Sequence, residues 1–106
     1  WEQAAERYMQ VKKTIAEMNA RYFKKFWKES TGDKLTDSWG SSTYYFETDY
    51  NLNVKKQLQL FQNGKKLKYD EQNIEDEFGF LTDQTLDIEE FTDNEIKKNE
   101  FDEIWS

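Results

Sequence analysis

The chain has 106 residues, a formal net charge of −7 and neither cysteine nor histidine, which excludes disulfides, zinc–thiolate centres and catalytic sites built on imidazole. The length is that of a single domain, 1–106, and no apolar run approaches the roughly 18–20 residues that a membrane span needs. The 4 Trp, 6 Tyr and 8 Phe supply core volume that the few aliphatic residues lack.

Residues 2–20 are predicted to form a helix, because apolar residues recur at alternating steps of four and three along one side. Such a stripe either packs on the domain's own sheet, the commoner case, or forms a coiled-coil seam that would support weak self-association. The segment 1–20 is then a helical part of the domain or an extension ahead of an α+β body at 21–106. The stripe consists of Ala4, Tyr8, Val11, Ile15, Met18 and Tyr22.

Two strands are expected in the next part of the chain. Residues 21–28 are bulky and aromatic, which favours a strand, although their periodicity also allows a continued helix. Residues 29–42 are rich in Gly, Ser, Asp and Thr and indicate a loop. Residues 43–48 alternate as a strand does, so that Tyr44 and Phe46 share one face and Tyr45 and Glu47 the other.

A β-hairpin is predicted around Asn63-Gly64, the preferred pair for a two-residue type I′ turn. The strands are 54–62 and 65–70. If Gln62 pairs with Lys65, Leu60 lies opposite Leu67 and Leu58 lies opposite Tyr69. One face of the hairpin is then apolar, and the opposite face carries Gln57, Gln59, Lys66 and Lys68.

Residues 70–94 are predicted to form a long acidic loop that inserts apolar anchors into the core. The anchors are Phe78, Phe80, Leu81, Leu86, Ile88 and Phe91. A short helix is expected at 98–105, with Phe101, Ile104 and Trp105 on one face. The acidic residues in its last turn oppose the helix dipole, so this helix is expected to depend on docking through Trp105.

Charge is divided unequally along the chain. Residues 1–69 carry 13 basic and 8 acidic side chains, whereas residues 70–106 carry 2 basic and 14 acidic ones. An anionic field of this kind attracts basic protein surfaces and repels the phosphates of nucleic acid. We therefore predict a binding protein whose partner is a basic protein, and we expect neither nucleic acid nor a membrane as partner.

Three other chemistries are disfavoured by the sequence. Carboxylate pairs such as 75–77 and 89–90 resemble those that hydrolyse glycosides, but with 22 acidic residues close pairs arise by chance. Asp83 and Asp87 are of the type that bind Ca²⁺, yet the spaced acidic loop of an EF-hand is missing. Lysines interleaved with aromatic residues are found on nucleic-acid surfaces, which the acidic C-terminal third disfavours. No enzyme activity, metal or cofactor is predicted.

Five segments together resemble a family of small, acidic, largely uncharacterised bacterial proteins. They are YFKKFWKES at 22–30, TYYFETD at 43–49, QLQLFQNGKKLKYD at 57–70, EDEFGFLTDQTLDIEEF at 75–91 and EFDEIW at 100–105. The resemblance implies an α+β domain whose antiparallel sheet begins near residue 22, which decides 21–28 in favour of a strand. It also implies a role as an immunity protein, the cognate inhibitor of a secreted or contact-delivered toxin. Residues 1–20 depart from the family's pattern.

The combined prediction is an α+β fold with an N-terminal helix, an antiparallel sheet of about four strands with the Asn-Gly hairpin, a long acidic loop and a short C-terminal helix. The predicted function is that of a cytoplasmic immunity protein that binds a cognate toxin domain through an acidic surface. The alternative is a structural or regulatory interaction module, as the C-terminal domain of a larger protein. The predicted contact residues are Glu75, Asp76, Glu77, Asp83, Asp87, Glu89 and Glu90, with Trp39 and Tyr50 as aromatic anchors.

Overall fold

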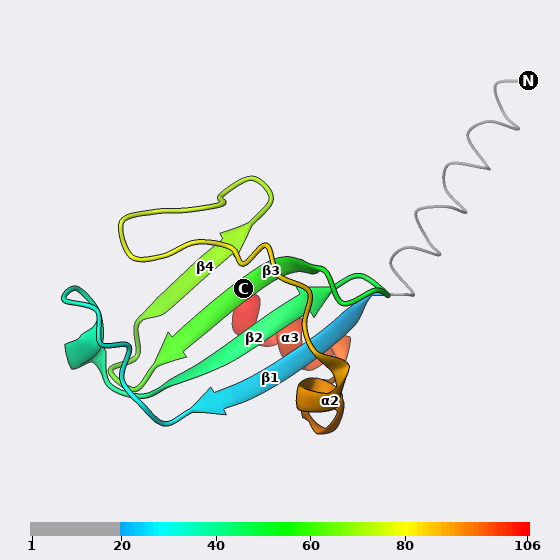
Figure 1. The fold of residues 1–106 in the computed structure, drawn as a ribbon, viewed down its shortest axis with the longest axis horizontal. Helices are drawn as coiled ribbons and strands as arrows, with labels where there is room; N and C mark the ends of the chain where they lie inside the picture. The colour runs from blue at the N-terminus through cyan, green and yellow to red at the C-terminus, as the bar shows by residue number, and fades with distance from the viewer. Residues whose placement is uncertain (1–19) are drawn as a thin grey trace, which may run out of the picture.

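The computed structural model describes residues 20–106, which form a five-stranded antiparallel sheet with helices on both faces (Figure 1). The predicted helix 2–20 and most of its stripe lie outside the described residues. The last stripe member, Tyr22, lies in the first strand and is buried.

The sheet has the strand order β4-β3-β2-β1-β5. The predicted α+β class is confirmed, and the described part of the chain has one strand more than the four expected. The additional strand, β5, is very short and pairs with the first two core positions of β1. The strands are β1 (Arg21–Trp27), β2 (Ser42–Thr48), β3 (Val54–Phe61), β4 (Lys66–Asp70) and β5 (Glu95–Ile96).

The hairpin of β3 and β4 forms around Asn63-Gly64, but its predicted turn and register are wrong. Phe61 and Gly64 close a β-turn through a 2.9 Å hydrogen bond, and Gly64 has φ +90°. These features define a three-residue loop with a bulge glycine in place of a two-residue type I′ turn. Leu60 consequently pairs with Lys66, one residue away from the predicted partner Leu67.

The shifted register follows from the covering of both sheet faces. The prediction placed all four apolar hairpin residues on one face, as in a sheet that is solvated on its other side. In the structure Leu58 and Leu60 face a helix, whereas Leu67 and Tyr69 lie on the opposite face together with Gln57 and Gln59. The shift therefore gives each face its own apolar cluster and buries two glutamines.

The C-terminal helix α3 (Lys98–Trp105) has the predicted bounds and covers one face of the sheet (Figure 1). Phe101 is fully buried 5.3 Å from the ring of Tyr22, and Trp105 stacks on Phe101 at 5.7 Å. Lys66 and Lys68 donate hydrogen bonds to the carbonyl oxygens of Ile104 and Trp105 at 3.3 and 2.7 Å. These cations stabilise the end of the helix dipole that the acidic last turn opposes.

The opposite face is covered by irregular chain. We name residues 71–87 the covering loop; it connects β4 to α2 (Ile88–Phe91) and passes in front of the sheet (Figure 1). The predicted loop at 70–94 is thus partly helical, since α2 and the 3-10 turn η2 (Thr92–Asn94) end it. Another 3-10 turn, η1 (Asp37–Trp39), lies in the loop between β1 and β2.

Candidate functional site

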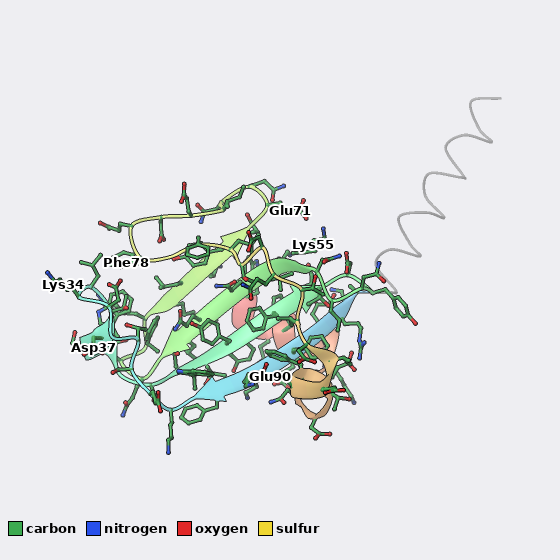
Figure 2. All side chains as sticks on the ribbon, viewed as in Figure 1. Lys34, Asp37, Lys55, Glu71, Phe78 and Glu90 are labelled. Carbon is green, nitrogen blue, oxygen red and sulfur yellow. The ribbon has the colours of Figure 1, made fainter. Side chains whose placement is uncertain are left out.

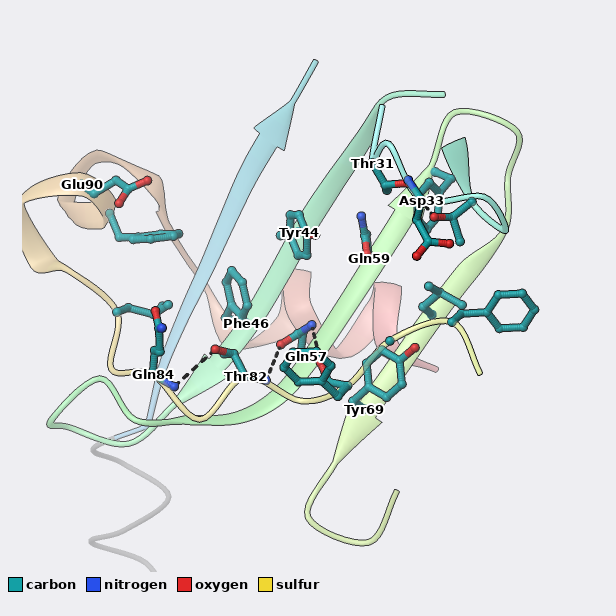
Figure 3. A pocket seen from close by; sticks show the side chains of 18 of the residues that line it. Thr31, Asp33, Tyr44, Phe46, Gln57, Gln59, Tyr69, Thr82, Gln84 and Glu90 are labelled. Atoms are coloured by element: carbon teal, nitrogen blue, oxygen red, sulfur yellow. Dashed lines mark hydrogen bonds between the residues drawn. The ribbon is translucent and has the colours of Figure 1, made fainter. Parts of the chain in front are cut away.

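A groove lies on the sheet face beneath the covering loop, with a volume of about 530 Å³. Its floor follows from strand alternation, because paired residues of an antiparallel sheet project to the same side. Tyr44 pairs with Gln59, and Phe46 pairs with Gln57. Figure 3 shows these four side chains between Glu90 at one end of the groove and Asp33 at the other.

Gln57 fixes the covering loop to the sheet. Its side-chain amide donates to the carbonyl of Phe80 at 3.2 Å, and its carbonyl accepts from the backbone amide of Thr82 at 3.0 Å (Figure 3). A buried primary amide in this geometry satisfies both of its hydrogen-bonding groups with the backbone of one segment. The loop is therefore held against β3 in one register, as a further strand would be.

Tyr69 and Asp76 fix the tip of the loop. The Tyr69 hydroxyl donates to Asp76 Oδ1 at 2.7 Å, and the same oxygen accepts from the amides of Phe78 and Gly79. Partial burial raises the pKa of Asp76, but these three hydrogen bonds outweigh it and hold the pKa below its ordinary value. Burial and the neighbouring carboxylate raise the pKa of Tyr69.

Glycine at position 79 leaves room for this contact. A Cβ atom built on Gly79 would lie 3.1 Å from the Tyr69 hydroxyl oxygen, closer than most van der Waals contacts allow. The backbone of the loop therefore approaches the phenol directly, and the tip stays in place over β4.

At the other end of the groove, α2 forms a wall. Its Phe91 is buried against Phe23 and Phe46, with ring centroids 5.9 and 5.8 Å away. Asp87 caps the helix by accepting from the amide of Glu89 at 2.9 Å, and Glu90 forms an ion pair with Lys25. The end of the groove is thus anchored by one aromatic cluster and one ion pair.

The seven predicted acidic residues lie on the covering loop and α2, over one face of the sheet. Asp76 and Asp87 accept backbone hydrogen bonds and act as structural groups, whereas Glu90 is paired with Lys25. The other four are exposed and form no side-chain hydrogen bond or ion pair with the described residues. They are Glu75, Glu77, Asp83 and Glu89.

The two predicted aromatic anchors differ in position. Trp39 is half-buried, with its ring 5.0 Å from Phe61 and 5.2 Å from Phe78, so it supports the tip of the covering loop. Tyr50 is exposed in the turn between β2 and β3. Neither belongs to the lining of the groove.

An exposed aromatic residue that the sequence reading placed in the core lies among the acidic residues. Phe80 is 64% exposed and lines the groove, although its neighbour Phe78 packs on Trp39. Gly79 lies between the two residues and interrupts any regular alternation. The sequence pattern therefore does not show that Phe78 is packed and Phe80 exposed. The buried glutamines were also missed, because the Gln-Leu alternation of β3 is typical of a strand with one solvated face.

Basic side chains gather on the other face of the sheet. Strand alternation places Lys24, Lys56, Lys66 and Lys68 on the α3 face, where Lys56 and Lys68 lie over the Trp105 ring. Among the residues that line the groove, three are acidic and none is basic. Figure 2 shows Glu71 at the start of the covering loop, Phe78 at its tip and Glu90 on α2. The α3 face thus carries these lysines together with the carboxylates of α3, whereas the charged residues that line the groove are all acidic.

Comparison of the chain with protein-family models, with curated proteins and with solved structures gave no match in any of the three. Within residues 20–106, no three acidic side chains converge as ligands of a metal ion. No helix in this part of the chain has the length and apolar character that a membrane span requires.

Proposed function

We propose that the protein is a non-enzymatic binding protein that holds the basic surface of a partner protein against its covering-loop face. The specific role proposed is that of a cytoplasmic immunity protein that neutralises a cognate toxin domain. The charged surface supports the binding function, and the resemblance of the sequence to suspected immunity proteins supports the specific role.

One observation carries the proposal: a loop that is fixed in position presents an exposed aromatic ring and, close to it in the sequence, several unpaired carboxylates. Glu75, Glu77 and Asp83 flank the exposed Phe80 in sequence, and Gln57 and Tyr69 hold the backbone that carries them. Protein interfaces place aromatic anchors within polar rims. A loop that is already ordered loses little conformational entropy when it binds.

The charge arrangement suits an inhibitor that must bind quickly. Complementary fields raise association rate constants by about 10- to 1,000-fold at low ionic strength. A toxin with a basic substrate cleft, such as a nuclease, presents the complementary surface. The acidic face would occupy that cleft and exclude a phosphate-bearing substrate from it.

The test compares two triple variants of equal net charge. Glu75→Gln, Glu77→Gln and Asp83→Asn remove three charges from the covering loop, and Glu100→Gln, Asp102→Asn and Glu103→Gln remove three from α3 on the opposite face. The partner in stopped-flow association is the C-terminal domain of the protein encoded immediately upstream, which the proposal expects to be the toxin. We expect the loop variant to associate about tenfold more slowly at low salt, with a flatter salt dependence, and the α3 variant to resemble the wild type. Equal effects of the two variants would contradict the proposal.

A further inference from the structure

The groove contains an acceptor oxygen that the protein itself leaves unused. Gln59 is 7% exposed, and its side-chain amide donates to Ser42 Oγ at 3.0 Å. Its side-chain carbonyl has no hydrogen-bond partner among residues 20–106. In this part of the chain, every side-chain nitrogen or oxygen that is sealed from solvent has a partner. The free Gln59 carbonyl must therefore open into the groove that this residue lines.

Tyr44 supplies an aromatic face and a second free oxygen beside it. It pairs directly with Gln59 across β2 and β3, so both side chains rise from the same point of the floor (Figure 3). The Tyr44 hydroxyl makes no hydrogen bond with the described residues, and burial raises its pKa, which keeps it neutral. The ring lies 5.7 Å from that of Phe46, with only 3° between the two planes. The two rings are thus parallel and stacked, and both line the floor of the groove.

The charge of the lining decides which ligand suits this surface. Asp33, Asp87 and Glu90 line the groove, and no lysine or arginine does. Lys25 offsets Glu90, which leaves an anionic lining above an aromatic floor with free acceptor oxygens. A planar cation with several in-plane donors satisfies all three features, because a guanidinium stacks on rings and donates to oxygen at its edge. An ammonium group offers no planar face.

We propose that the groove receives an arginine side chain of the partner, which stacks on the Tyr44 ring and donates to the carbonyl of Gln59. This inference rests on the proposed binding function and specifies the residue that the partner inserts. It adds a recognition element distinct from the exposed carboxylates of the covering loop. Those carboxylates raise the association rate, whereas the buried arginine would slow dissociation.

The probe for this inference is Nα-acetyl-arginine amide, titrated into the isotope-labelled protein and followed by NMR. Nα-acetyl-citrulline amide is the matched control, because it has nearly the same shape without the charge, and Nα-acetyl-lysine amide tests the need for a planar cation. We expect the arginine compound to shift the Gln59 side-chain amide and the Tyr44 and Phe46 ring signals. We expect both control compounds to bind about tenfold more weakly, because citrulline lacks the charge-assisted hydrogen bond and lysine lacks the planar cation that stacks on a ring.

Two variants identify the groups involved. Gln59→Met removes the carbonyl and keeps the length of the side chain, and Tyr44→Phe removes only the hydroxyl; an unchanged backbone spectrum verifies the fold of each. We expect Gln59→Met to weaken arginine binding about tenfold. Shifts confined to the covering-loop carboxylates, or equal binding of arginine and citrulline, would overturn the inference while leaving the proposed function intact. The proposed function is tested separately: equal association rates of the two triple variants would contradict it.

Discussion

Replacing Gln57 by methionine removes the two hydrogen bonds that fix the covering loop and keeps an unbranched side chain of similar length. The bonds to the Phe80 carbonyl and from the Thr82 amide measure 3.2 and 3.0 Å. Each contributes about 0.5–1.5 kcal/mol net. Phe80 is exposed, so water replaces part of what is lost. The expected loss is therefore about 1–2 kcal/mol, confined to the loop.

Hydrogen exchange of the Thr82 amide measures this loss directly, because that amide donates to Gln57 in the native state. A loss of 1–2 kcal/mol corresponds to exchange about 5- to 30-fold faster. Gln72→Met is the matched control, since Gln72 is exposed and its side chain makes no hydrogen bond with the described residues. If the Thr82 amide exchanges at the same rate in both variants, and each variant has a native spectrum, Gln57 does not hold the covering loop on the sheet.

Three further predictions concern stability and pH. Trp105→Ala should lower the free energy of unfolding by about 2–4 kcal/mol, because the ring stacks on Phe101; a denaturant midpoint within error of the wild type would contradict this. The pKa of Asp76 lies below its ordinary value, so its stabilising effect is complete above about pH 4 and disappears as pH falls through that lower pKa. The amide NMR signals of its hydrogen-bond donors Phe78 and Gly79 should then titrate with a midpoint below about 3.9, and a midpoint above it would refute the assignment. Glu95→Gln should cost about 0.5–1 kcal/mol at low salt and almost nothing at about 1 M salt, since it breaks an exposed pair with Arg21; a salt-independent loss would point to packing instead.

Local signals predicted much of the sheet and the last helix. The alternation of residues 43–48 placed Tyr44 and Phe46 on one face, as β2 has them, and the spacing of Phe101, Ile104 and Trp105 gave the bounds of α3. Such patterns are readable because each element has one dominant periodicity. The resemblance decided the strand at 21–28, and β1 confirms it.

The register of the hairpin depended on information that is not local. Asn63-Gly64 suits both a two-residue turn and a three-residue loop with a bulge glycine, and the choice changes which face every side chain of one strand meets. Because α3 and the covering loop cover both faces of the sheet, the three-residue loop with the bulge glycine is the arrangement that buries apolar side chains on each face. The buried glutamines of the groove follow from that arrangement, so the floor of the candidate site could not be predicted from the hairpin sequence alone.

The acidic residues of the C-terminal third do not all lie together. Those of the covering loop and α2 lie on one sheet face, whereas those of α3 lie on the opposite face. Composition could not separate the structural carboxylates of Asp76 and Asp87 from the exposed ones, since that distinction depends on nearby backbone amides. The exposure of Phe80 likewise could not be predicted from composition, since it depends on how the loop lies on the sheet, where Gln57 donates to the Phe80 carbonyl.

The most direct test of the recognition surface is a hydrogen-exchange footprint of the protein bound to its toxin domain. Protection is expected in residues 75–83 and in the groove strands near Tyr44 and Gln59, with little change in α3. Protection confined to α3, and none in the covering loop, would contradict the assignment of the acidic face as the binding surface.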